Sequence, residues 1–366
     1  MIKRWRLAFL LLVLSGFLNP CFSQPPSGYY DPAIGLSGKP LQQALHNIIR
    51  NHTVSSYTPG VWQAFYTTDC KPNNTVWDIY SDIPDGSPNG NPPYIYHFGT
   101  DQCGTATQEG DCYSREHSWP KSWFGGAVLP MYTDLFIIYP TDQYVNGRRS
   151  DYPYGEVGVA TWTSLNGSQL GNCVTTGYSE KVFEPRDEYK GDLARSYFYV
   201  SVRYYTEDSG WPGSPMATGS QLNPWALAML KQWNQDDPVS SKEIDRNNAI
   251  FLIQNNRNPF IDHPEFVSGI WGGGTGILPT ASFSRELFIC PNPTGAYCSI
   301  ALPFEFTNQE PVVETYLPTG KKIDVPCGFD GSSVTLDMKN CPAGLYFFTL
   351  KGPQAKTVFH GKIIRE

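Results

Sequence analysis

A glycine-rich stretch, Gly272-Gly-Gly-Thr-Gly, divides this 366-residue chain into two parts with different patterns. Before it, apolar residues recur at helical spacing in several segments. After about residue 285, short apolar segments alternate with turn residues, as in a β-rich fold. Because such a glycine run favours a flexible joint, and one domain usually takes about 100–200 residues, the sequence predicts two domains. We place them at 24–272 and 285–366, with a linker over 273–284.

The composition favours a folded chain rich in loops. Hydrophobic residues make up 40% of it and charged residues 17%, which allows a sizeable core and argues against disorder. Abundant glycine and proline, with 14% aromatic residues, disfavour a helical bundle or a coiled coil. The net charge of −7 excludes a surface that is basic throughout, although it leaves room for a local basic groove.

Residues 1–23 have the pattern of a secretion signal. A basic segment precedes an apolar run over residues 7–18, and small residues then allow cleavage after Ser23. The run is short for a membrane span, which needs about 20 residues. A membrane anchor and a lipid anchor on Cys21 are the alternatives. Cleavage would remove three positive charges and bring the net charge from −7 to −10. We expect the mature protein to be secreted or attached to the cell surface.

Cleavage would also leave eight cysteines, an even number that favours disulfide bonds in a secreted chain. No Cys-x-x-Cys pair occurs, so a zinc finger is disfavoured. Cys103 and Cys112 are close enough in sequence to form a local pair. Four of the eight lie before residue 270 and four after residue 285, so each half can pair within itself. The spacing leaves the connectivity open.

The patterns predict an α+β fold followed by a small all-β sandwich. Helices are expected over residues 37–51, 190–205, 224–234 and 241–255. Strands and turns are expected within 76–100. In the C-terminal part, strands are expected over residues 296–302, 312–316, 334–338 and 345–350.

Arg115, Glu116 and His117 place a cation, a carboxylate and an imidazole side by side. The imidazole can accept a proton from water near neutral pH, and the carboxylate can hold a hard cation such as Mg²⁺. These groups suit metal-assisted hydrolysis of a phosphodiester. Neighbouring side chains on a strand point to opposite faces, so Glu116 and His117 can share a site only if the backbone bends. Pro120 indicates that regular structure ends nearby.

A second segment supplies a neutral ligand and further cationic groups, which the first segment lacks. Asn146 offers a neutral oxygen ligand, and the guanidinium groups of Arg148 and Arg149 suit phosphate. The 29 positions between His117 and Asn146 are enough for a hairpin and a short helix.

Several sequence motifs together indicate a specific resemblance to a known protein family. They are Val76-Trp-Asp-Ile-Tyr-Ser, Tyr113-Ser-Arg-Glu-His-Ser-Trp-Pro, Val145-Asn-Gly-Arg-Arg-Ser, Gly191-Asp-Leu-Ala-Arg and Gln254-Asn-Asn-Arg-Asn-Pro-Phe-Ile-Asp-His-Pro. From about Tyr29 to Trp271 the chain resembles the endonuclease I family of secreted nucleases, which belongs to the His-Me finger (ββα-metal) nucleases. The resemblance implies a ββα-metal core within the first domain. It also implies a secreted, Mg²⁺-dependent, sequence-nonspecific endonuclease that hydrolyses DNA and, as a further substrate, RNA.

The resemblance also implies roles for individual residues. His117 would be the general base for water, while Glu116 and Asn146 would hold Mg²⁺, with Ca²⁺ or Mn²⁺ as alternatives. Arg195 would be a catalytic arginine that faces phosphate or supports the site. The remaining arginines of the two segments, Arg115, Arg148 and Arg149, would bind substrate, although Arg148 and Arg149 could equally be solvated surface charge.

The chain departs from the family pattern at three positions. Phe136 and Ile137 stand where the family commonly has a polar pair, and Ser114 where it often has asparagine. The alternative to an active endonuclease therefore comes from another functional class. It is a catalytically weakened surface protein that keeps the nuclease fold and only binds nucleic acid or another polyanion.

The C-terminal part resembles the sorting domain of type IX secretion. The resemblance rests on Cys290-Pro-Asn-Pro-Thr-Gly, Tyr316-Leu-Pro-Thr-Gly-Lys-Lys, Pro342-Ala-Gly-Leu-Tyr-Phe and the basic end Lys362-Ile-Ile-Arg. It implies outer-membrane secretion machinery as a partner, and no other protein partner is evident. A ligand-binding β-sandwich is the alternative.

Overall fold

The computed structural model describes residues 25–83, 94–272, 289–302, 311–331, 333–351 and 358–366. The described residues form an α+β part before residue 273 and a β-rich part after residue 288, each with its own hydrophobic core. The predicted fold class is thus confirmed. The predicted leader and the linker over 273–284 lie outside the described residues. None of the described helices has the length and hydropathy needed to cross a membrane.

The predicted helices of the first part are confirmed, with ends that differ by a few residues. They are α1 (Gly38–Ile49), α4 (Lys190–Arg203), α5 (Pro224–Asp236) and α6 (Ser241–Gln254). The structure adds the short helices α2 (Trp62–Thr68), α7 (Pro259–Asp262) and α8 (Phe266–Trp271). Ser240 and Glu243 form a capping box that begins α6.

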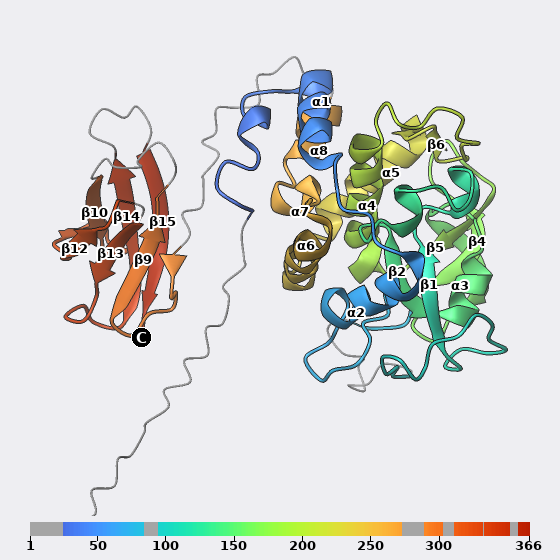
Figure 1. The fold of residues 1–366 in the computed structure, drawn as a ribbon, viewed down its shortest axis with the longest axis horizontal. Helices are drawn as coiled ribbons and strands as arrows, with labels where there is room; N and C mark the ends of the chain where they lie inside the picture. Colours follow the sequence, from blue (N-terminus) through green and yellow to red (C-terminus); the bar gives the residue numbers. More distant parts are fainter. Residues whose placement is uncertain (1–24, 84–93, 273–288, 303–310, 332, 352–357) are drawn as a thin grey trace, which may run out of the picture.

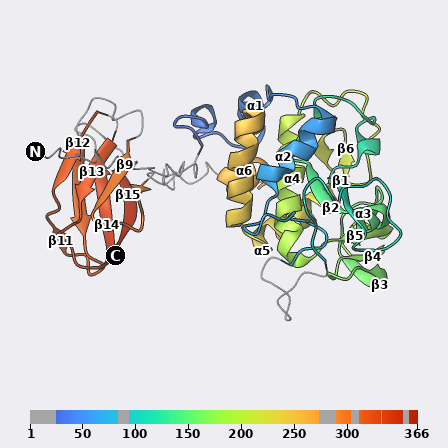
Figure 2. The same cartoon turned by 60° about the horizontal axis from the view of Figure 1, so that its bottom comes forward.

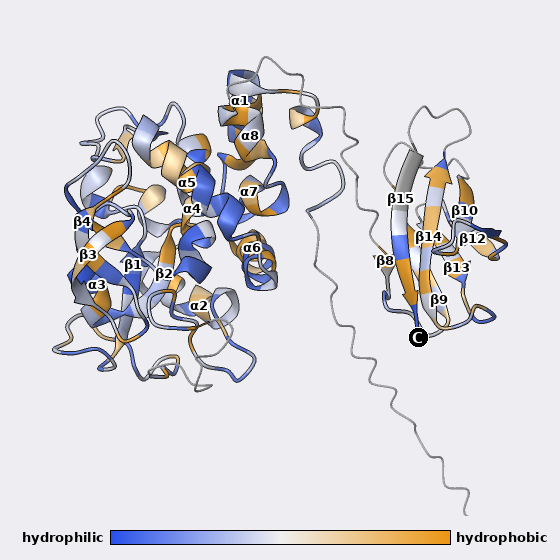
Figure 3. Cartoon of the chain, turned by 180° about the vertical axis from the view of Figure 1, so that it is seen from behind, coloured by the Kyte–Doolittle hydropathy of each residue, from blue (hydrophilic) through white to orange (hydrophobic). Residues whose placement is uncertain are grey.

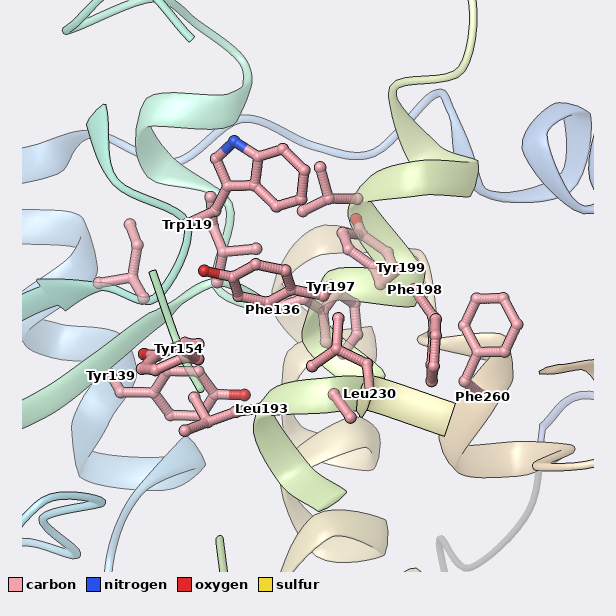
Figure 4. Close-up of a cluster of buried hydrophobic side chains, with 14 of the residues drawn as sticks. Trp119, Phe136, Tyr139, Tyr154, Leu193, Tyr197, Phe198, Tyr199, Leu230 and Phe260 are labelled. Atoms are coloured by element: carbon pink, nitrogen blue, oxygen red, sulfur yellow. The ribbon is translucent and has the colours of Figure 1, made fainter. Parts of the chain in front are cut away.

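Helix α4 is the centre of this part, because every one of its residues is buried. Figures 1 and 2 show α4 between α6 on one side and the strands β1 and β2 on the other. Its aromatic side chains pack against residues from many segments, as Figure 4 shows for Tyr197, Tyr199 and their neighbours. Truncation of such a buried aromatic side chain costs about 3–5 kcal/mol, so α4 holds the surrounding segments in place.

A strand–strand–helix unit lies against α4. Strand β1 (Tyr113–His117) pairs antiparallel with β2 (Ile138–Asp142), and α3 (Gln143–Arg149) follows β2 directly. Asp142 begins α3 by accepting a hydrogen bond from the Val145 amide at 2.8 Å. The unit therefore has the order of the predicted ββα core.

Smaller sheets complete the first part. Strands β3 (Val157–Thr163), β4 (Gln169–Cys173) and β5 (Lys181–Glu184) form an antiparallel sheet, and β6 (Ala217–Thr218) pairs with β7 (Gln221–Leu222). None of these strands was predicted.

The strands predicted within 76–100 are not found in the described parts of that range. Val76 makes only an isolated bridge with Cys70, and the residues that follow form turns. Instead, the Asp78 carboxylate accepts hydrogen bonds from the nearby Tyr80 amide at 2.8 Å and from the distant Asp142 amide at 2.6 Å. Such side-chain bonds to the backbone replace a strand ladder.

The C-terminal part consists of two antiparallel four-stranded sheets. Their orders are β11-β10-β14-β15 and β12-β13-β9-β8. The strands are β8 (Ile289–Cys290), β9 (Tyr297–Ala301), β10 (Val312–Tyr316), β11 (Lys322–Ile323), β12 (Cys327–Phe329), β13 (Ser333–Asp337), β14 (Gly344–Lys351) and β15 (Val358–Arg365). Along β14, Tyr346, Phe348 and Leu350 are buried in the common core, while the residues between them face outward. Figure 3 shows the hydrophobic segments of these strands, and the predicted strands and sandwich are confirmed.

One predicted disulfide bond is present, between Cys103 and Cys112. Four other cysteines have no disulfide partner among the described residues: Cys70, Cys173, Cys298 and Cys341. For these four cysteines, the pairing within each half that the sequence allows is not found. Cys173 is buried in β4, whereas Cys70 lies in the bridge with Val76, so these two are held in different segments.

Candidate active site

An open cavity of about 500 Å³ lies at the strand–strand–helix unit. Its lining includes five of the seven predicted site residues, namely Arg115, Glu116, His117, Asn146 and Arg149. Three residues of β1 and two of α3 thus meet at one place. We call this space the main cavity.

Glu116 and His117 both reach the main cavity although they are neighbours in sequence. Both residues are only 4% exposed. His117 is the last residue of β1, and from Ser118 onward the chain leaves the strand toward Pro120. Regular strand structure thus ends directly after His117, close to Pro120 as expected, and both residues line the main cavity.

The His117 imidazole has a fixed orientation. Its Nε2 atom lies 3.0 Å from the Tyr132 carbonyl oxygen, and its ring stacks on the Tyr132 ring at 5.5 Å. A carbonyl oxygen only accepts, so Nε2 carries the proton and Nδ1 is left as the acceptor. Burial lowers the pKa of His117 to about 4, and the nearby cations Lys121 and Arg115 act in the same direction. The imidazole is therefore neutral at neutral pH and can accept a proton.

The Glu116 carboxylate is held through one of its two oxygens. Oε1 accepts hydrogen bonds from Arg149 Nη1 at 2.7 Å and from the Tyr80 hydroxyl at 2.9 Å. No described side chain donates a hydrogen bond to Oε2. Burial raises the pKa of Glu116, while Arg149 and Tyr80 stabilise its charged form. The carboxylate thus presents one fixed oxygen to the protein and one to the main cavity.

Asn146 supplies a second oxygen to the same space. Its Nδ2 atom donates to Ser114 Oγ at 3.1 Å, which leaves Oδ1 without a donor among the described residues. One carboxylate oxygen and one amide oxygen are ligands that fit a hard cation such as Mg²⁺. No cluster of three or more His, Cys, Asp or Glu side chains suited to a metal occurs in the described part of the chain. A cation held by Glu116 and Asn146 would keep much of its water, as Mg²⁺ commonly does.

Arg149 borders the main cavity but binds the protein. Its side chain is fully buried, with Nη1 also donating to the His117 carbonyl at 3.0 Å and Nη2 to the Ser118 carbonyl at 2.6 Å. Its predicted contact with substrate is therefore corrected. Both terminal nitrogens of Arg149 are engaged by the protein, so they do not face substrate. Through these contacts Arg149 fixes the end of β1 and the Glu116 carboxylate.

Arg115 forms part of the cavity wall. Its guanidinium lies 3.6 Å from the centre of the Tyr57 ring and 4.3 Å from that of Trp62. It donates to the Tyr57 carbonyl and, at 2.8 Å, to Thr58 Oγ1. This stacked, half-buried position keeps a positive charge at the edge of the cavity. Exposed Lys121 adds a second one.

Arg195 does not belong to the main cavity, which corrects the prediction that it faces phosphate. It is fully buried in α4, and its Nε and Nη2 atoms donate to the two oxygens of Glu243 at 2.5 and 2.7 Å. Its Nη1 atom donates to Asn234 and to the Asp237 carbonyl. Arg195 connects α4 with α5 and α6. Of the two roles expected for it, the structure therefore fits support of the fold.

Tyr80, Tyr132 and Lys121 also belong to the site, although they were not predicted from the sequence. Tyr80 lies in the Val76–Ser81 motif, so that motif was the available signal. Lys121 directly follows the motif that runs from Tyr113 to Pro120. Tyr132 contributes through its backbone and its ring, and no feature of its sequence neighbourhood indicates that.

Phe136 and Ile137 lie behind the site and do not line the main cavity. Both are buried, and the Phe136 ring lies 4.7 Å from the Tyr199 ring of α4. The departure from the family's polar pair is therefore accommodated by the core.

Comparison with known proteins places the chain in a family. The family model for endonuclease I matches residues 37–265. The extracellular ribonuclease of Bacillus amyloliquefaciens is 38% identical over 253 residues, which cover 66% of this chain and 78% of the relative. The chain therefore belongs to the endonuclease I family.

Two more distant relatives match shorter segments. Endonuclease-1 of Buchnera aphidicola (subspecies Baizongia pistaciae) is 32% identical over 130 residues, 35% of this chain and 46% of the relative. The periplasmic deoxyribonuclease of Aeromonas hydrophila is 25% identical over 131 residues, 35% of this chain and 47% of the relative.

Proposed function

We propose that this protein is a secreted, Mg²⁺-dependent endonuclease that hydrolyses phosphodiester bonds in DNA and RNA without sequence preference. The observation that carries the proposal is the content of the main cavity. A neutral, oriented imidazole on His117 shares it with the free oxygens of Glu116 and Asn146. The family membership and the names of the relatives, a ribonuclease among them and a deoxyribonuclease, support both substrates.

The proposed reaction follows the His-Me finger mechanism. The water oxygen bonds to phosphorus as the bond to the leaving sugar oxygen breaks, and that oxygen takes up a proton from solvent. His117 Nδ1 accepts the proton of the attacking water, while the Tyr132 carbonyl keeps the ring in the required tautomer. Glu116 and Asn146 would hold Mg²⁺, which when bound would offset the negative charge that develops on the phosphate oxygens. Arg115 and Lys121 add positive charge at the rim and orient the strand. Binding that relies on such cations weakens as the salt concentration rises.

The predicted secretion signal and the names of extracellular and periplasmic relatives support an extracellular location. We propose that the C-terminal sheets form the type IX sorting domain, which outer-membrane secretion machinery would recognise. Clearance or scavenging of nucleic acid would be a natural use of such an enzyme.

The experiment is a cleavage assay with the mature chain, residues 24–366. Supercoiled plasmid and RNA are each incubated with Mg²⁺ or with EDTA. His117→Ala is compared with His97→Ala, which removes an exposed histidine outside the main cavity. We expect cleavage that requires Mg²⁺, is lost by about 10²–10⁴-fold in His117→Ala, and is retained in His97→Ala.

The alternative of a polyanion-binding protein without activity rested on Phe136 and Ile137. Since both lie in the core, the geometry of the main cavity gives it no separate support. Retention of nucleic acid without cleavage in Mg²⁺ would nevertheless favour it and contradict the proposed function.

A further inference from the structure

Helix α3 presents two faces to two adjacent spaces. Gln143, Asn146 and Ser150 line the main cavity, whereas Tyr144, Gly147 and Arg148 line a second hollow. Asn146 and Ser150 follow Gln143 by three and seven positions, and Gly147 and Arg148 follow Tyr144 by three and four, as expected for two sides of a helix. The opposite wall of the second hollow is the loop over residues 104–106.

The second hollow adjoins the main cavity, because Gly104 and Gln143 line both. The Cys103–Cys112 disulfide closes the loop that forms the shared rim. A chain molecule lying in the main cavity could therefore continue into the second hollow along α3.

The chemistry of the second hollow suits a nucleotide. Exposed Arg148 has its guanidinium carbon 4.9 Å from the centre of the Tyr144 ring and 5.8 Å from that of Trp162. No carboxylate among the described residues forms an ion pair with Arg148. An unpaired guanidinium can bind a phosphate, and aromatic rings beside it can stack on a base.

Two glycines keep the second hollow open. A β-carbon on Gly104 or Gly147 would meet nothing within 4 Å, and neither residue has a left-handed backbone. Neither packing nor backbone conformation therefore requires glycine at these positions. Gly147 is moreover inside a helix, where glycine is an unfavourable residue. Their lack of side chains leaves space against the backbone for a ligand.

We propose that the second hollow is a binding subsite for a nucleotide that flanks the bond to be cleaved. Arg148 binds its phosphate, and the Tyr144 and Trp162 rings pack against its base. This inference rests on the proposed function. It implies that the protein prefers polynucleotides to dinucleotides and that α3 serves both catalysis and strand binding.

The test compares substrates of two lengths. Values of kcat/KM are measured for a dinucleotide, which can fill only the main cavity, and for a single-stranded 12-mer. The variants are Arg148→Ala, Trp162→Ala and Gly147→Leu, and the last fills the hollow while favouring the helix. We expect kcat/KM to fall about 10-fold on the 12-mer and less than about 2-fold on the dinucleotide. Arg50→Ala, which removes an exposed arginine at the end of α1, is the control and should change neither value.

An equal fall on both substrates, or no fall on the 12-mer, would overturn the subsite. Failure of the proposed function is distinguished by a second readout, the affinity for a fluorescent 12-mer in EDTA measured by anisotropy. If the parent protein cuts neither substrate but Arg148→Ala still weakens binding, the proposed function fails and the subsite stands. If Arg148→Ala binds the 12-mer as tightly as the parent protein, the subsite is wrong.

Discussion

Two buried Arg–Glu pairs lie in different regions of this protein and are built differently. In the helical interior, Arg195 donates to both oxygens of Glu243, and the Ser240 amide also binds that carboxylate. At the strand–strand–helix unit, Arg149 and Tyr80 donate to the same single oxygen of Glu116. The first pair is closed, whereas the second leaves an oxygen toward the main cavity.

Under the proposed function, the difference separates a pair that supports the fold from a pair that serves the site. A buried ion pair needs all its polar atoms satisfied, since desolvation costs several kcal/mol per ion. The closed pair meets this condition within the protein. The open pair meets it only if something else binds the second oxygen of Glu116, and in our account that partner is the cation.

The closed pair gives the largest expected effect on stability. Arg195→Met leaves Glu243 buried without its counter-ion, so the free energy of unfolding should fall by about 3–5 kcal/mol. Urea unfolding measures this fall, and the affinity of the folded protein for Mn²⁺ should not change. A loss of Mn²⁺ binding or of kcat without a loss of stability would mean that Arg195 acts at the site.

The buried His117 makes stability depend on pH. Its pKa of about 4 in the folded state lies below the ordinary value of about 6.5 in the unfolded chain. Between these values the unfolded state binds more protons, so stability falls as the pH falls from 6.5 to 4, by about 3 kcal/mol. Urea unfolding of metal-free protein at both pH values, beside His117→Gln, isolates this contribution. Equal losses in the two proteins would contradict it.

The Cys103–Cys112 disulfide should contribute less to stability but should affect long substrates. Replacing both cysteines with serine releases a short loop and should cost about 2–3 kcal/mol. Since the loop borders both the main cavity and the second hollow, kcat/KM on a 12-mer should fall more than on a dinucleotide. Thermal unfolding together with these two assays checks the expectation, which an unchanged substrate preference would contradict.

Tyr80→Phe tests the open pair and has the smallest expected effect of these variants. It removes one of the two hydrogen bonds that hold Glu116 Oε1, and loss of such support for a metal ligand weakens cation binding by about 10-fold. Tyr204→Phe is the matched control, because it removes a buried hydroxyl bonded to Asp134, away from the main cavity. Titration with Mn²⁺ compares them. Equal affinities would show that Tyr80 does not position the carboxylate.

The helices and C-terminal strands could be predicted because their apolar residues follow the period of the element. The turns after Val76 could not, because they depend on the Asp78 carboxylate binding the amide of a residue 64 positions away. Such a long-range bond leaves no periodic trace in the sequence.

The sequence motifs predicted which residues form the candidate site, but not the role of each one. His117, Glu116 and Asn146 come together as expected, because a strand end and the following helix bring them there. The roles of the arginines could not be predicted. Arg149 and Arg195 both lie in motifs, and only their burial and partners distinguish positioning and support from contact with phosphate.

The most direct test of the central claim is the affinity for Mn²⁺, measured by electron paramagnetic resonance, in the parent protein, Glu116→Gln and Glu243→Gln. The account predicts that Glu116→Gln weakens binding at least about 10-fold. Glu243→Gln should lower stability but leave the affinity of the folded protein unchanged. Equal Mn²⁺ affinities of Glu116→Gln and the parent protein would contradict the claim that the open Arg–Glu pair is the metal site.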